Sequence, residues 1–101
     1  MNNLQDARAY NGVDSSYLSS HDIQTTAVCI KKGWQEVFST DPSRIWMTDE
    51  KDGVISIYTP QFIYLADIKA EGSKSNVTYY HNGDRFWGTK EKLTSAIKRC
   101  L

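Results

Sequence analysis

Two cysteines constrain the fold of this 101-residue chain most strongly, because they lie in two amphipathic stretches near its opposite ends. Cys29 lies in the first stretch, and Cys100 is the penultimate residue. A disulfide can join them only if the two stretches are neighbours in the fold. We predict this disulfide, and such a bond persists only in an oxidising compartment. The alternative is a pair of buried free thiols, since cysteine is common in protein cores.

Length and composition indicate one small folded domain. Hydrophobic residues make up 40% of the chain, which suffices for a core. Residues 1–18 are polar, and we expect a flexible N-terminal arm there, followed by a single domain over residues 19–101. Twelve basic residues balance twelve acidic ones. Attraction to nucleic acid is therefore not expected, and no apolar run approaches the roughly 20 residues of a membrane-spanning helix.

Apolar periodicity predicts one helix near each end of the domain. Residues 20–38 carry apolar side chains at three- and four-residue spacing, with Ser19 or Ser20 as the N-cap. A second helix is expected from about Thr89 to the C-terminus, with Cys100 on its apolar face. Cys29 flanks the apolar stripe of the first helix, where a bond to a neighbouring helix is favoured.

Four short β-type runs lie between these helices, over residues 44–48, 54–58, 61–68 and 75–81. Their short connections favour an antiparallel arrangement. Asn82-Gly83 is a good hairpin turn, so Arg85-Phe86-Trp87 forms either a short fifth strand or a loop. The predicted fold is α+β in the order α-β-β-β-β-α. It is an antiparallel four-stranded meander with the N- and C-terminal helices packed on one face.

Alternation of side chains along the strands predicts a sheet with two unlike faces. The aliphatic face, which would carry the helices, is expected to hold Ile45, Met47, Ile55, Ile57, Ile63 and Leu65. The aromatic face is expected to hold Trp46, Ser56, Tyr58, Phe62, Tyr64, Ala66 and Tyr80. Exposed aromatic patches often mark binding surfaces. We therefore hypothesise that four of these side chains contribute to a binding surface: Trp46, Tyr58, Tyr64 and Tyr80. The alternative is that cross-strand aromatic pairs only stabilise the sheet.

Motifs for catalysis, cofactors or metals are missing from the sequence. No nucleophile elbow or phosphate-binding glycine loop is present, and the cysteines and histidines lack the spacing of zinc ligands. The acidic segment from Asp49 to Gly53 fits no EF-hand register and is predicted to be a hairpin turn. We expect a protein that is not an enzyme and has no cofactor or metal.

Several loose motifs are shared with one class of proteins. They are a polar arm, Ala27-Val28-Cys29-Ile30 leading to Trp34, Leu65-Ala66-Asp67-Ile68, Val77-Thr78-Tyr79-Tyr80, and a terminal Cys100-Leu101. Over about residues 20–101 the chain resembles small envelope proteins and lipoproteins of Gram-negative bacteria. The resemblance implies export and supplies no catalytic residues. A lipoprotein needs an acylated cysteine at its mature N-terminus, so the anchor is either removed here or never existed.

The expected function is that of a non-enzymatic, exported, envelope-associated binding or accessory domain, including the lipoprotein form. Its location would be the periplasm or the outer membrane, with a membrane tether only through a removed N-terminal anchor. Its partner would be another protein, not nucleic acid. One alternative is a periplasmic inhibitor or immunity protein. Another is a small cytoplasmic enzyme or regulator with free thiols. Residues 1–5 do not form a signal peptide, so the chain is either cytosolic or a mature region behind an added Met1.

Overall fold

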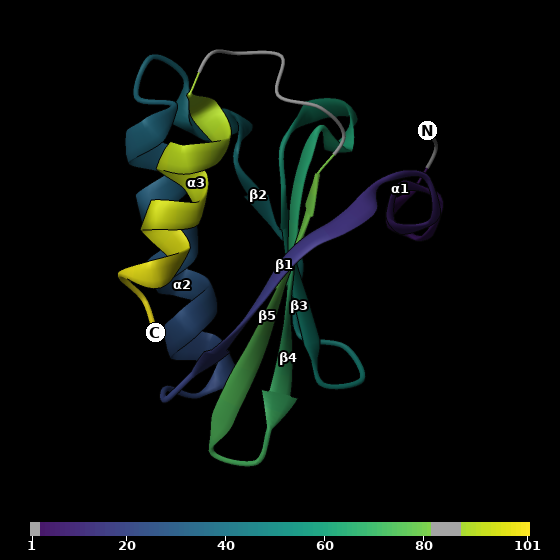
Figure 1. Cartoon of the computed structure of the whole chain (residues 1–101), viewed down its shortest axis with the longest axis vertical. Helices are drawn as coiled ribbons and strands as arrows, with labels where there is room; N and C mark the ends of the chain where they lie inside the picture. The colour runs from purple at the N-terminus through teal and green to yellow at the C-terminus, as the bar shows by residue number, and fades with distance from the viewer. Residues whose placement is uncertain (1–2, 82–87) are drawn as a thin grey trace.

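The structure is a computed structural model that describes residues 3–81 and 88–101. Within these residues, one five-stranded antiparallel sheet, in the order β1-β5-β4-β3-β2, is flanked by three helices (Figure 1). The elements are α1 (Leu4–Tyr10), β1 (Gly12–Ser19), α2 (Ile23–Val37), β2 (Trp46–Met47), β3 (Val54–Tyr58), β4 (Tyr64–Glu71), β5 (Lys74–His81) and α3 (Thr89–Lys98), with 3-10 turns η1 (Pro42–Arg44) and η2 (Pro60–Phe62). The α+β class is thus confirmed.

The number of strands was wrong, because the sheet has five strands and not four. The additional strand, β1, and helix α1 lie in the segment that was expected to be a flexible arm. β1 pairs with β5 from Gly12 opposite His81 to Ser19 opposite Ser75, with an irregularity between Val13 and Ser15. Backbone pairing makes this segment a strand, although its side chains are mostly polar. The strand considered at residues 85–87 and the Asn82-Gly83 turn lie outside the described residues.

Helices α2 and α3 lie side by side on one face of the sheet, and α1 lies on the other (Figure 1). Asp22 is the N-cap of α2, where its carboxylate accepts a hydrogen bond of 2.8 Å from the backbone N–H of Thr25. The apolar stripe of α2 is buried against the sheet through Ala27, Ile30 and Trp34. These residues have the three- and four-residue spacing of an amphipathic helix.

The predicted disulfide between Cys29 and Cys100 is confirmed, with an S–S distance of 2.06 Å. It joins α2 to the residues that follow α3. The helices approach closely because Gly33 has no side chain: a Cβ there would lie 2.9 Å from Cβ of Ala96. Nearby, the indole N–H of Trp34 donates to the carbonyl of Leu93 over 3.3 Å. Packing and a covalent bond therefore hold α3 against α2.

The assignment of side chains to the two faces was wrong for β4. Ala66 lies opposite Ile57 and Leu65 lies opposite Tyr58, so Ala66 faces the helices and Leu65 faces away. Tyr64 also belongs to the core beneath the helices. β4 begins at Tyr64, three residues later than the predicted strand. The alternation of side chains between the two faces therefore starts at Tyr64 and does not continue from the preceding turn. An offset of one residue transfers every side chain of a strand to the other face.

None of the helices in the described ranges is long and apolar enough to cross a membrane.

Candidate binding surface

The face of the sheet that turns away from α2 and α3, here termed the second face, carries cross-strand rows of side chains. The first row crosses all five strands and is termed the apolar row: Val13, Tyr80, Leu65, Tyr58 and Trp46. The adjacent row is termed the polar row: Ser16, Thr78, Asp67 and Ser56. The second face therefore presents an apolar strip beside a hydrogen-bonding strip.

Three aromatic rings are in tilted contact at one end of the apolar row and form what we term the aromatic cluster: Trp46, Tyr58 and Phe62. The ring centroids of Trp46 and Tyr58 lie 5.6 Å apart, and those of Tyr58 and Phe62 lie 5.2 Å apart. Trp46 remains 44% exposed, and the other two rings are half-buried. Aromatic pairs at these distances attract one another beyond the burial of their area. The cluster offers a preformed aromatic surface to solvent.

The turn that carries Phe62 has an unusual backbone. Gln61 and Phe62 both have positive φ, at 60° and 54°, although neither is glycine. Each such residue costs on the order of 1–3 kcal/mol and persists only where its surroundings determine it. One such restraint comes from Asn11, whose side-chain amide donates to the carbonyl of Phe62 over 2.9 Å. The junction between α1 and β1 thus helps hold Phe62 beside Tyr58.

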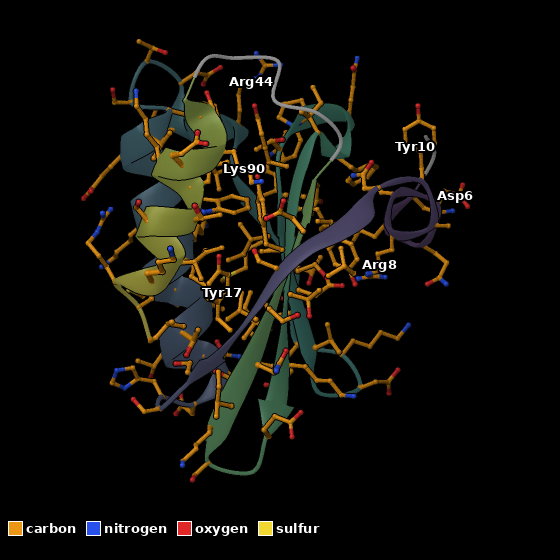
Figure 2. The ribbon with its side chains drawn as sticks, viewed as in Figure 1. Asp6, Arg8, Tyr10, Tyr17, Arg44 and Lys90 are labelled. Carbon is orange, nitrogen blue, oxygen red and sulfur yellow. A yellow bond between two sulfur atoms is a disulfide. The ribbon has the colours of Figure 1, made fainter. Side chains whose placement is uncertain are left out.

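Arg8 connects α1 to the polar row. Its guanidinium donates from Nε and Nη2 to the two carboxylate oxygens of Asp67, over 2.6 and 3.0 Å, and from Nη2 to the hydroxyl of Ser56 over 2.9 Å. The Ser56 hydroxyl donates in turn to Asp67 over 2.6 Å. Figure 2 shows Arg8 extending from α1 toward the sheet, whereas Tyr10 points away from it. Three side chains from three elements therefore form one hydrogen-bonded group.

Charge and burial alter the protonation of two side chains in this region. The hydrogen bond to Asp67 raises the pKa of Arg8, which remains a cation. Burial raises the pKa of Tyr80, and the charge of Asp67 and a hydrogen bond to it add to the effect. Tyr80 is therefore a neutral phenol at physiological pH.

A shallow groove of about 560 Å³ lies between α1 and the segment that follows β2. Its walls include Gln5 and Arg8 of α1, Thr48, and the carboxylates of Asp49 and Asp52. Within residues 3–81 and 88–101, no group of three or more His, Cys, Asp or Glu side chains is placed to hold a metal ion. The groove mixes charges of both signs.

The structure brings together some of the four residues hypothesised to bind, and not others. Trp46 and Tyr58 are in contact, and Tyr80 lies in the same row beyond Leu65. Tyr64 does not join them, because it is only 2% exposed and its ring packs 6.1 Å from that of Phe38 in the core. We therefore no longer include it in the surface.

Two contributors to the surface were not anticipated from the sequence. Phe62 was expected on the aromatic face but was not among the binding residues, and the strained turn that positions it has no glycine to indicate it. Arg8 lies in the supposed arm, and nothing in the sequence links it to Asp67. No family model, curated protein or solved structure matches this chain.

Proposed function

We propose that this protein is an exported, non-enzymatic binding domain that contacts another protein through its aromatic cluster. The observation that carries the proposal is the exposure of Trp46, which is 44% accessible while its ring contacts that of Tyr58. Tryptophan and tyrosine are the residues that most often dominate binding energy at protein interfaces. The neighbouring strained turn supports the same conclusion, because strain of this kind is concentrated at functional sites.

The disulfide supports the proposed location. A bonded Cys29–Cys100 pair is more consistent with an oxidising, exported location than with the cytoplasm. It also weighs against a cytoplasmic protein with free thiols. Together with the sequence resemblance to envelope proteins, it favours an accessory role in the periplasm or at the outer membrane.

The proposal is tested by comparing three immobilised chains: wild type, Trp46→Ala and Val28→Ala. Val28 is a matched control, since it is an exposed apolar side chain on α2, on the other side of the sheet. Each chain is incubated with an envelope extract of the host, and retained proteins are quantified by mass spectrometry. We expect one protein to be retained by wild type and Val28→Ala and reduced about tenfold or more with Trp46→Ala, the loss typical of an interface anchor.

Circular dichroism and the intact disulfide establish that each variant is folded. Equal retention by Trp46→Ala and wild type contradicts the proposal. If the retained protein is an enzyme or toxin that loses activity when bound, the domain is an inhibitor or immunity protein. If its activity is unchanged, the accessory role stands.

A further inference from the structure

Helix α1 depends on the sheet for its stability. It has seven residues, and isolated helices of this length do not persist in water. Its N-cap, Asn3, accepts a hydrogen bond from the backbone N–H of Asp6 over 2.8 Å, which supplies only local support. The contacts that join α1 to the second face must therefore hold it in place. Arg8 provides the charged contact, and Ala7 provides the buried apolar one.

The acceptor of Arg8 is built for a guanidinium group. Asp67 has a side chain only 12% exposed and accepts from two nitrogens of the same guanidinium. Ser56, which is buried, accepts from Nη2 while its own hydroxyl is directed to Asp67. Two parallel hydrogen bonds to one carboxylate match the planar fork of arginine and cannot be reproduced by the ammonium of lysine.

An apolar position lies beside this acceptor. Leu65 faces away from α2 and α3, yet it is completely buried. Helix α1 lies on that side of the sheet (Figure 1). Its residue Ala7 is also completely buried. Leu65 lies between Tyr58 and Tyr80 in the apolar row and two positions before Asp67 in β4, so a helix docked at Asp67 lies beside this row.

We propose that Asp67, Ser56 and Leu65 form a docking site for an arginine-bearing helical segment of a protein partner, and that α1 occupies this site until the partner displaces it. The inference rests on the proposed function for the existence of a partner, and it specifies the chemistry that the partner presents. The required features are those of α1 itself: an arginine for the carboxylate, preceded by a small apolar residue. Once bound, the segment leaves the adjacent aromatic cluster accessible to the rest of the partner.

Covalent attachment gives α1 an advantage over any free segment. α1 is joined to β1 through Asn11 alone, so it reaches the site as part of the same molecule, and a free segment must compete with it. The apparent affinity for a free segment is reduced by the fraction of chains in which the site is open. A substitution that weakens the contacts between α1 and the sheet should therefore strengthen the binding of a free peptide to the site.

The test uses the full chain and a synthetic peptide of residues 3–11. Four chains are compared: wild type, Arg8→Gln, Arg8→Gln combined with Asp67→Asn, and Lys90→Gln. Lys90→Gln is the matched control, because it removes another 2.6 Å ion pair, to Asp14, without touching the site. Binding is followed by the NMR signals of the Leu65 methyl groups. We expect the peptide to bind Arg8→Gln about tenfold or more tightly than wild type or Lys90→Gln, and binding to be lost with Asp67→Asn.

A second peptide in which Arg8 is replaced by Lys tests the guanidinium requirement, and we expect it to bind about tenfold or more weakly. Hydrogen exchange provides a measurement that needs no peptide. Amide protons of α1 should exchange about tenfold or more faster in Arg8→Gln than in wild type, while those of β4 are unchanged.

Three results of the peptide and exchange measurements would overturn the inference. They are a folded Arg8→Gln chain that binds no peptide, equal binding of the lysine peptide, and unchanged exchange in α1. Concentration-dependent dimerisation of Arg8→Gln would assign the site to α1 of a second copy and contradict the partner assignment. The proposed function is tested separately by Trp46→Ala. If that variant retains its partner while the peptide still docks at Asp67, only the proposed function fails.

Discussion

Removal of the Cys29–Cys100 disulfide should destabilise the protein chiefly because the unfolded chain gains conformational entropy. The two cysteines are 71 positions apart. In the chain-entropy model, closing a loop of that size contributes about 4 kcal/mol to the free energy of unfolding. The folded state should change little, because the contacts between Gly33 and Ala96 and between Trp34 and Leu93 do not involve the sulfur atoms. The expected loss is a large share of the roughly 5–15 kcal/mol of a typical domain.

Urea denaturation of wild type and the Cys29→Ala, Cys100→Ala double variant measures this loss. With a urea dependence of about 1–2 kcal/mol per M, the midpoint should fall by about 2–4 M. Wild type treated with a reductant is the control and should match the variant to within about 1 kcal/mol. A decrease below about 1 kcal/mol would refute the entropic reasoning. Altered hydrogen exchange throughout α2 in the folded variant would show that the bond shapes the native state.

Three further perturbations follow from local geometry. Gly33→Ala places a Cβ 2.9 Å from Cβ of Ala96, and overpacking of about 1–3 kcal/mol should outweigh a helix-propensity gain of about 1 kcal/mol. The Tm should fall and recover when Ala96→Gly is added, whereas a higher Tm for the single variant contradicts this. The pKa of Asp22 is lowered by its hydrogen bond to Thr25, so ionised Asp22 stabilises the fold above about pH 4, and this contribution is lost as the pH falls further. Asp22→Asn keeps a cap but should lose the corresponding pH dependence in urea titrations, and an unchanged profile would exclude this origin. The raised pKa of Tyr80 favours its neutral form in the fold, so stability should decline as the pH rises above about 10. Tyr80→Phe should decline less in the same measurement, and parallel curves would contradict the burial of the phenol.

Helices α2 and α3 and their covalent link were predictable because each depends on a strong local pattern, whereas α1 lies in the expected arm and was not predicted. α2 carries apolar side chains through Ala27, Ile30 and Trp34, and Cys29 flanks this stripe, whereas Cys100 ends the stripe of the last helix. β1 could not be predicted in this way. Asp14, Ser15 and Ser16 give no apolar alternation, and the segment becomes a strand through backbone pairing with β5. Pairing with a distant segment leaves no local signal.

The candidate surface was predictable where the side chains alternate within a regular strand, as for Trp46, Tyr58 and Tyr80. Trp46 and Tyr58 lie opposite each other in β2 and β3, so alternation within each strand sufficed to place them together. Tyr64 was assigned to the wrong face because Gln61 and Phe62 have positive φ values, so the extended conformation is interrupted just before β4. Non-glycine residues rarely adopt this conformation, and the sequence therefore indicates an extended segment there.

The pairing of β1 with β5 has a consequence for the order in which this protein folds. The first strand can join the sheet only after the last strand is available, and the disulfide likewise needs Cys100. Contacts between distant parts of a chain slow folding, because the intervening loop must close first. β3, β4 and β5 are consecutive and antiparallel, so they can assemble before β1 docks. In a chain connected in this way, β1 should be among the last elements to join the sheet, although it is the first strand along the sequence.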